Sequence, residues 1–317
     1  MAQRPSIRQL EYAVAVADTL HFGRAARQCA VSQPALSAQI QQLEELLGLQ
    51  IFERGRRRVL VTPEGERVLE KARDALAAID DLVARAAGSG EPLHGPLRLG
   101  VIPTVAPYLL PKLLPGVRER YPSLQLLLRE EQTALLVEQL ERGRLDALLL
   151  ALPVDEADLV ELPLFEEPFW FAAREGHPLL GARPVTLPEA ALEGEEVLLL
   201  EDGHCLRAQA LAVCQRAGAV VPGRIQATSL STLVQMVANG LGVTLLPERA
   251  LEVELRSAAG LAVKRFRPPA PSRTIGLAWR HGAAREEDFR LLGESLRQGL
   301  SEAGVPVRRA EEAPRSP

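Results

Sequence analysis

Two cysteines, Cys205 and Cys214, have the most distinctive chemistry in this chain of 317 residues. The apolar residues around them recur at helical spacing: Leu206, Ala210, Val213 and Ala217. Asp202 or Gly203 is a suitable N-cap before this stretch, so the pattern predicts one helix over residues 204–217. Cys205 then lies in the first turn of that helix.

The first turn of a helix favours the reactive form of a cysteine. Its free backbone N–H groups and positive dipole end stabilise a thiolate, and His204 and Arg207 are basic neighbours in the sequence, although two acidic residues precede them. A thiolate attacks the O–O bond of a peroxide, becomes a sulfenic acid and condenses with a second thiol. Cys205 is therefore a candidate redox residue.

The spacing of Cys205 and Cys214 constrains this chemistry. The two residues are nine positions apart, which on an intact helix is a rise of about 13.5 Å. A disulfide needs Cα atoms within about 7 Å, so these thiols pair only if the helix comes apart. The alternative is that these cysteines are inert core residues. It stays open at this point, because free cysteines are commonly small and buried, and Cys214 lies beside the apolar stripe.

The composition fits a soluble protein of two or three domains, with 47% hydrophobic and 25% charged residues. The sequence contains neither an apolar run of about 18 residues nor an N-terminal signal-peptide pattern. We therefore expect no membrane association and a cytoplasmic location, where thiols are kept reduced. Three cysteines without a C-x-x-C pair, and five histidines not grouped with them, predict no metal site and no cofactor.

The N-terminal residues carry a nucleic-acid signal. Residues 1–62 hold eight arginines and five acidic residues, whereas the whole chain has a net charge of −4. Two apolar helical patterns are followed by Ser32, which is a suitable N-cap for a third helix that admits Pro34 in its first turn. Gln33, Ser37 and Gln41 share the polar face of that helix. This arrangement predicts a helix-turn-helix whose third helix reads base edges.

A wing and a long helix are expected next. Residues 49–54 and 59–62 read as two short strands around Arg56, Arg57 and Arg58, a tip suited to phosphate contacts, although a solvated turn is the alternative. From Pro63, apolar residues recur every three to four positions for about three heptads. This seam predicts pairing with a second copy; packing within its own domain is the alternative.

Beyond residue 91, strand and helix patterns alternate, which predicts a parallel sheet covered on both faces. Residues 163–168 and 268–272 are expected to cross between two lobes, and the tail from residue 307 is expected to be disordered. Hydroxyl side chains follow several strands, where ligands bind in open α/β sheets: Thr104, Thr133, Thr228 and Ser229. Each alone fits an N-cap; together they predict one polar cleft.

Several motifs carry a family resemblance. They are Phe22–Ala26, Val31–Ser37, Leu43–Glu44, Gly100–Val105, Pro107–Pro111, Glu201–Arg207 and Arg273–Leu277, with Cys214 at the family's spacing. Over residues 5–300 the chain resembles LysR-type transcriptional regulators, and within them the OxyR hydrogen-peroxide sensors. Cys29 has no sensing counterpart and is expected in the core of the second helix.

The resemblance implies an α/β fold: a winged helix-turn-helix, a long linker helix, and a two-lobed regulatory domain like periplasmic binding proteins. The expected domains are residues 1–62, 63–90 and 91–305, with a tail at 306–317. It implies that Cys205 is the peroxidatic cysteine and Cys214 the resolving one. The implied peroxide pocket is Thr104, Thr133, His204 and Arg273. The implied DNA-binding residues are Ser32, Gln33, Pro34, Ser37, Gln41, Arg56, Arg57 and Arg58.

The partners that follow are double-stranded promoter DNA, hydrogen peroxide, cellular thiol reductants and a second copy in a homodimer or homotetramer; RNA polymerase is a further candidate. The alternative within the same family is a regulator that answers a non-redox small-molecule coinducer, with both cysteines inert. An enzyme, either a thiol peroxidase or a cysteine hydrolase, is disfavoured. His204 would point about 100° away from Cys205 on a helix, which is a poor geometry for a base.

Overall fold

The computed structural model describes residues 4–54, 59–87, 92–154, 158–181, 185–223 and 226–305. Contacts divide the chain into two units, Met1–Gly90 with Arg142–Arg144, and Glu91–Glu141 with Leu145–Pro317. Within the described ranges, no helix has both the length and the apolar character needed to cross a membrane.

The first unit contains the predicted helix-turn-helix. Its helices are α1 (Ile7–Thr19), α2 (Phe22–Gln28) and α3 (Gln33–Leu47). Ser32 caps α3, because its side chain accepts a hydrogen bond from the backbone N–H of Ala35, and Pro34 occupies the first turn. The core between the helices consists of buried apolar side chains: Tyr12, Val16, Ala26, Leu36, Ile40 and Leu43. Cys29 packs against this core, as expected.

A short hairpin follows, with β1 (Phe52–Arg54) antiparallel to β2 (Val59–Val61). A carboxylate oxygen of Glu44 accepts hydrogen bonds from the backbone N–H groups of Ile51 and Phe52, which ties the hairpin to α3. Arg56, Arg57 and Arg58 lie outside the described residues, so their role stays a prediction. The linker helix α4 (Pro63–Ala87) begins where the Thr62 hydroxyl accepts a hydrogen bond from the Gly65 N–H.

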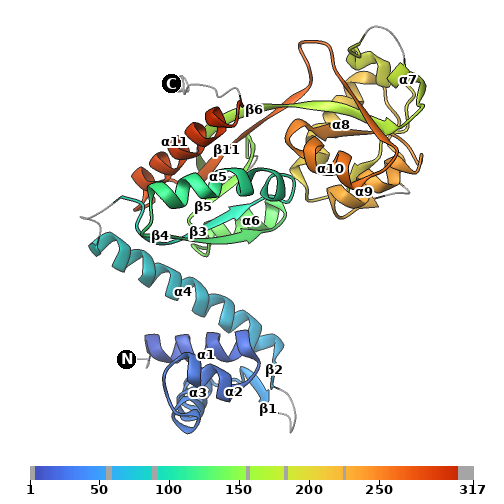
Figure 1. Ribbon diagram of the computed structural model, residues 1–317. Helices are drawn as coiled ribbons and strands as arrows, with labels where there is room; N and C mark the ends of the chain where they lie inside the picture. Colours follow the sequence, from blue (N-terminus) through green and yellow to red (C-terminus); the bar gives the residue numbers. More distant parts are fainter. Residues whose placement is uncertain are drawn as a thin grey trace. The chain divides into compact units, whose positions relative to one another are not determined.

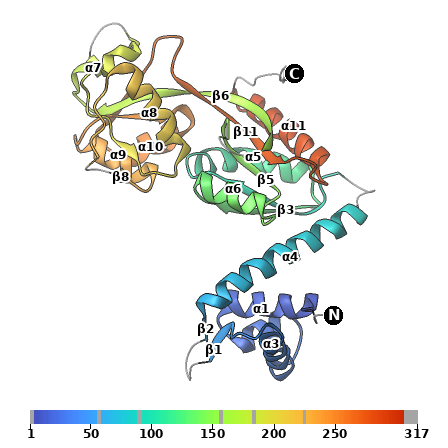
Figure 2. The same ribbon diagram turned by 180° about the vertical axis from the view of Figure 1, so that it is seen from behind.

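The second unit begins with lobe I. Three parallel strands, β3 (Gly95–Val101), β4 (Leu124–Glu130) and β5 (Ala147–Leu152), are joined by β11 (Ser272–Arg280), which is antiparallel to β5. Helices α5 (Ala106–Arg120) and α11 (Glu286–Glu302) pack together on one face of the sheet, and α6 (Thr133–Glu141) covers the other (Figures 1 and 2).

One strand, β6 (Leu159–Arg174), belongs to both lobes. Its first part pairs with β11, and its second part pairs with β9 (Thr244–Pro247) and β10 (Leu261–Arg265), so it runs from one lobe into the other (Figure 1). The expected crossing at 163–168 is therefore the middle of a continuous strand. The prediction of a parallel sheet is wrong. Strand β11 is antiparallel to both β5 and β6, so the sheet is mixed.

Lobe II holds the cysteine helix, and its elements are α7 (Pro178–Gly181), η1 (Glu189–Leu192), β7 (Leu199–Leu200), α8 (Cys205–Ala217), β8 (Gln226–Ala227), α9 (Leu230–Ala238), η2 (Glu248–Ala250) and α10 (Leu251–Ser257), together with β9, β10 and the end of β6. The sequence analysis did not predict α10 or β10. Each lobe has its own apolar core, around Trp279 and Phe289 in lobe I and around Phe169 and Phe171 in lobe II. Residues 306–317, the expected tail, lie outside the described residues.

Two glycines of this unit predict opposite effects on stability. A Cβ at Gly276, in β11, would lie 2.6 Å from the carbonyl oxygen of Leu162 on β6, whereas Gly116 in α5 faces open space. We expect Gly276→Ala to destabilise the unit by about 1–3 kcal/mol and Gly116→Ala to stabilise it by about 0.5–1 kcal/mol. Both tryptophans, Trp170 and Trp279, lie in this unit, so urea unfolding followed by tryptophan fluorescence measures each effect. Equal changes in the two variants would contradict this packing.

Candidate functional site

Helix α8 holds both candidate redox cysteines, as predicted. It begins at Cys205 and ends at Ala217, where Gly218 takes the left-handed conformation and its N–H donates to the carbonyl of Cys214. The N-cap is His204 rather than Asp202 or Gly203, and its side chain makes no capping hydrogen bond. The thiol of Cys205 therefore stands at a helix N-terminus whose N-cap side chain does not cap it.

The two cysteines belong to different apolar cores. Cys205 is half-buried and packs against the core of lobe I, although its helix belongs to lobe II. Cys214 is fully buried within the core of lobe II. Both thiols are free, and the intact helix keeps them about 13.5 Å apart along its axis.

Burial decides the protonation state of Cys214. Removal from water, with a smaller contribution from Glu189, raises the pKa of its thiol to about 11. Cys214 is therefore a protonated thiol at neutral pH while α8 is folded, and it is a poor nucleophile in that state. Its reactivity depends on leaving the core of lobe II.

His204 and Arg207 do not act as the sequence suggested. Burial lowers the pKa of His204, and the nearby Glu201 carboxylate and a backbone hydrogen bond to Thr228 offset this only in part, so the ring is neutral at pH 7. Arg207 donates to Asp202 Oδ1 at 2.7 Å and to the Leu200 carbonyl at 2.9 Å. Neither side chain is therefore a free positive charge beside Cys205, which stands at the N-terminus of α8.

The loop before Cys205 contacts Gln132, a residue of lobe I. The amide nitrogen of Gln132 donates to Glu201 Oε1 at 2.9 Å and lies 3.3 Å from His204 Nε2. The residue after Gln132 is Thr133, so the structure brings two of the four implied pocket residues, Thr133 and His204, to the same part of the lobe boundary. The sequence analysis missed Gln132.

Two polar atoms near this region have no hydrogen-bond partner among the described residues. They are the buried Thr133 Oγ1 and Gln209 Oε1. Gln209 lies four positions after Cys205 and so shares its face of α8. A buried polar atom without a partner is costly unless a ligand or water satisfies it. Each of these two atoms is therefore open to a hydrogen bond from a water or a ligand. The helical spacing from Cys205 was the signal that could have identified Gln209.

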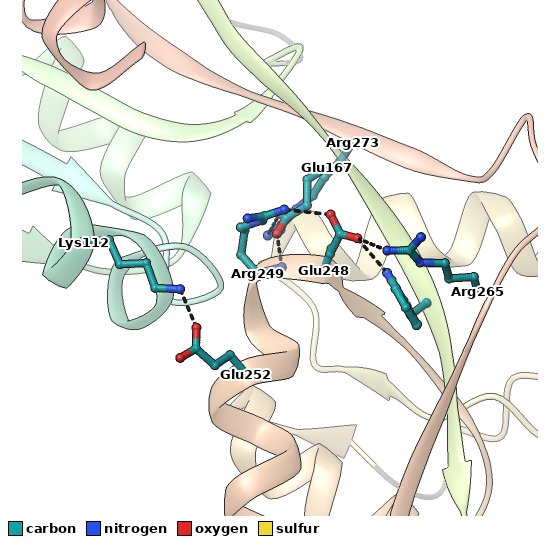
Figure 3. A network of polar contacts seen from close by, with 8 residues as sticks. Lys112, Glu167, Glu248, Arg249, Glu252, Arg265 and Arg273 are labelled. Atoms are coloured by element: carbon teal, nitrogen blue, oxygen red, sulfur yellow. Dashed lines mark hydrogen bonds and ion pairs between the residues drawn. The ribbon is translucent and has the colours of Figure 1, made fainter. Parts of the chain in front are cut away.

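The other two implied pocket residues, Thr104 and Arg273, contact each other. The Arg273 guanidinium donates to Thr104 Oγ1 at 2.9 Å and to the Thr104 carbonyl at 3.0 Å. It also forms a fully buried ion pair with Glu167 on β6, with 2.7 Å between Arg273 NH2 and Glu167 Oε2. The second Glu167 oxygen accepts the Arg249 backbone N–H, which fixes the place where β6 enters lobe II (Figure 3).

Further polar contacts join the lobes. The Tyr108 hydroxyl, on α5, donates to Glu254 on α10 at 2.6 Å, and burial together with this carboxylate raises the pKa of Tyr108. Nearby, Lys112 pairs with Glu252 on the same two helices (Figure 3). The relative position of the lobes is therefore set by hydrogen bonds and ion pairs as well as by the two crossing segments.

Ser229, another of the candidate hydroxyl residues, has a local structural role. Its hydroxyl caps α9 by accepting the Thr232 N–H, which is the role considered from the sequence. The prediction that the four hydroxyls share one cleft stays a prediction. On α3, Gln33, Pro34 and Gln41 are exposed and Ser37 is half-buried. In the described ranges, no cluster of three or more His, Cys, Asp or Glu side chains is placed to hold a metal ion.

Comparisons with known proteins cover nearly the whole chain. The family model described as "Bacterial regulatory helix-turn-helix protein, lysR family" matches residues 7–66, and "LysR substrate binding domain" matches residues 90–301. A protein of Streptomyces viridosporus named "Probable hydrogen peroxide-inducible genes activator" is 48% identical over 307 residues, which is 96% of this chain and 97% of the relative.

Two solved structures are similar over their full length. A full-length OxyR variant from Pseudomonas aeruginosa has a TM-score of 0.71 at 36% identity and covers 93% of this chain and 95% of its own. A Corynebacterium glutamicum OxyR mutant with H2O2 bound has a TM-score of 0.65 at 36% identity and covers 98% and 99%.

The raised pKa of Cys214 predicts a pH-dependent stability. The folded thiol holds its proton more tightly than the unfolded thiol, whose pKa is near 9.0, so its contribution is complete below pH 9 and is lost as the pH rises through about 11. We expect the difference in unfolding free energy between the wild type and Cys214→Ala to shrink by about 1–2 kcal/mol over that interval. Urea unfolding in the presence of a reductant measures it. A difference that does not change with pH would contradict the burial of a neutral thiol, and Cys205→Ala serves as the matched control.

Proposed function

The chain belongs to the LysR family of bacterial DNA-binding transcriptional regulators, within its OxyR group, and from this membership we propose that it senses hydrogen peroxide through a Cys205–Cys214 disulfide. The observation that carries the proposal is the placement of the two thiols on one helix. Cys205 stands at its N-terminus on the lobe boundary, and Cys214 is protonated in the core of lobe II. The names of the relatives, and a solved relative that holds H2O2, support the choice of oxidant.

The reaction has two steps. The Cys205 thiolate attacks one oxygen of hydrogen peroxide, the O–O bond breaks, and the leaving hydroxide takes a proton to become water. The resulting sulfenic acid is then attacked by the Cys214 sulfur, the S–O bond breaks, and a second water leaves. Two thiols have been oxidised to one disulfide and one peroxide reduced to two waters, and cellular thiol reductants reverse the change.

The peroxide would be held by polar groups around Cys205. Thr133 Oγ1 and Gln209 Oε1 are buried and have no hydrogen-bond partner among the described residues, so each would accept a hydrogen bond from a peroxide bound beside it. Arg273 would act through Thr104, whose hydroxyl it fixes. The neutral His204 would hold the loop before Cys205 in place and would not act as a base.

The second step requires α8 to unwind, since the helix keeps the sulfurs too far apart. Unwinding also releases Cys214 from the environment that raises its pKa, so the thiol becomes reactive as it leaves the core of lobe II. Loss of a helix that packs in one lobe and contacts the other changes the lobe boundary. This change is the signal that we propose the regulatory domain passes to promoter DNA.

DNA binding is assigned to the N-terminal unit. Ser32 sets the start of α3, and the exposed face of that helix presents Gln33, Pro34 and Gln41, with Ser37 half-buried beside them. These side chains would read base edges in the major groove, and the wing arginines would contact phosphates. RNA polymerase is the expected further partner at the promoter, in the cytoplasm.

The competing function within the family is a response to a non-redox coinducer. The full burial of Cys214 is also what an inert core cysteine would show. A thiol peroxidase or cysteine hydrolase is less well supported, because burial lowers the pKa of His204 and so weakens it as a base, and its Nε2 lies 3.3 Å from the Gln132 amide nitrogen.

Mass spectrometry after a brief peroxide pulse tests the proposed disulfide. We expect one equivalent of peroxide to join Cys205 to Cys214 in the wild type, Cys205→Ser to remain unmodified, and Cys214→Ser to stop at a sulfenic acid that a dimedone probe traps. Cys29→Ser is the control and should behave like the wild type. An unchanged peptide map in the wild type would favour the coinducer alternative.

The apolar seam of α4 is the proposed dimer contact. Leu82 and Val83 are 66% and 60% exposed on its C-terminal half. An apolar groove on the same unit is lined by residues that include Leu10, Leu47, Leu49, Val68 and Ala72. The exposed apolar side chains of α4, and an apolar groove formed by α1, α3 and α4, fit pairing with the α4 of a second copy.

Charge substitution in the seam tests this pairing. We expect Leu82→Glu to weaken dimerisation at least tenfold, because burying a leucine contributes about 1.5–3 kcal/mol. Sedimentation over a range of protein concentrations measures the dissociation constant. Val185→Glu, at an 87% exposed position of the other unit, is the control and should leave it unchanged. An identical dissociation constant for both variants would place the dimer contact elsewhere.

A further inference from the structure

Gln132 contacts three of the four residues that precede Cys205. Its amide nitrogen donates to Glu201 Oε1 at 2.9 Å and lies 3.3 Å from His204 Nε2. Its amide oxygen lies against Gly203, where a Cβ would be only 2.5 Å from it. Gly203 also has a φ of +96°, which favours glycine. The loop from Glu201 to His204 is therefore fitted around the end of one glutamine side chain.

The contacts require a group that donates two hydrogen bonds. The Glu201 carboxylate only accepts. Burial favours the neutral His204 ring, and a neutral imidazole has one N–H donor and one ring nitrogen that accepts. In the tautomer that carries its proton on Nδ1, Nε2 is an acceptor for the Gln132 amide 3.3 Å away. The two protons of the Gln132 amide satisfy both acceptors, which neither a carboxylate nor an apolar side chain can do.

Gln132 is itself held in lobe I. It lies between β4, which ends at Glu130, and α6, which begins at Thr133. Its carbonyl accepts the Leu136 N–H in the first turn of α6. The side chain thus extends from a fixed backbone in lobe I to a loop of lobe II, directly beside the first turn of α8.

We propose that Gln132 is a positioning residue for Cys205, which holds the Glu201–His204 loop against lobe I and keeps the first turn of α8 wound in the reduced protein. The redox part of this inference rests on the proposed disulfide switch. The loop must move when α8 unwinds, so the Gln132 contacts stabilise the reduced form against the disulfide. The Gln132 contacts also keep Cys205 at the lobe boundary, close to the start of α6 at Thr133. Loss of Gln132 therefore has two effects: the disulfide becomes more favourable, and the first reaction with peroxide becomes slower.

The first experiment needs no redox chemistry. Gln132→Leu keeps the size of the side chain and removes both donors, and Gln125→Leu, at an exposed glutamine of β4, is the matched control. In the reduced full-length protein, we expect amide hydrogen exchange at residues 209–212, whose N–H groups donate to the carbonyls of the first turn of α8, to be about tenfold faster in Gln132→Leu than in the control. Equal exchange in the two variants would overturn the anchoring role.

The second experiment measures the redox consequence. In glutathione buffers we expect Gln132→Leu to shift the equilibrium about tenfold toward the disulfide, which corresponds to about 30 mV for this two-electron couple. In a Cys214→Ser background, trapping of the Cys205 sulfenic acid should be several-fold slower with Gln132→Leu than without it. A simple loss of stability would not change these two quantities in opposite directions. An unchanged redox equilibrium would overturn the redox part.

A paired substitution provides the rescue. Gln132→Glu alone places two carboxylates together and should give a larger effect than Gln132→Leu. Its combination with Glu201→Gln restores one donor and one acceptor with the roles exchanged, and should recover part of the protection from exchange. No recovery would mean that the Glu201 contact is not the anchor. If the wild type forms no disulfide while exchange still responds to Gln132→Leu, the proposed function fails and the anchoring role stands.

Discussion

The length of an α-helix is the constraint on which this molecule depends. Cys214 lies nine positions after Cys205, a rise of about 13.5 Å on the intact helix, and a disulfide tolerates about 7 Å between Cα atoms. No rotation of side chains removes that difference. A covalent link between these sulfurs therefore requires the loss of α8, which turns a local oxidation into a change of fold in one part of lobe II.

The tertiary structure makes that loss consequential, because the helix serves both lobes. Cys214 contributes to the core of lobe II, whereas Cys205 packs against the core of lobe I. The boundary that they span is held by β6, by the buried ion pair between Arg273 and Glu167, and by the Tyr108–Glu254 hydrogen bond. These contacts give the two lobes a defined arrangement, and the N-terminal end of α8, at Cys205, packs against lobe I within it.

Burial sets the protonation state of two groups in and beside α8, the Cys214 thiol and the His204 ring. Burial keeps Cys214 protonated within the core of lobe II. His204, which looks basic in the sequence, is kept neutral by burial and is placed to receive a hydrogen bond from Gln132. Among the described residues, two buried polar atoms, Thr133 Oγ1 and Gln209 Oε1, have no hydrogen-bond partner.

The local elements follow from the order of residues alone: the capped helices of the N-terminal unit, the cysteine helix with its two thiols, and α6 with its start at Thr133. Hydrophobic periodicity and capping residues reflect contacts between residues within about four positions of one another. These elements have both the regular apolar spacing and the capping residues, so a single sequence is enough to predict them. Four features became evident only in the folded chain: the continuous strand β6, the antiparallel β11, the neutral state of His204 and the contacts of Gln132. Each depends on partners far along the chain, such as Glu167 and Arg273, which are 106 residues apart. Burial and long-range pairing of this kind leave no periodic mark in a single sequence.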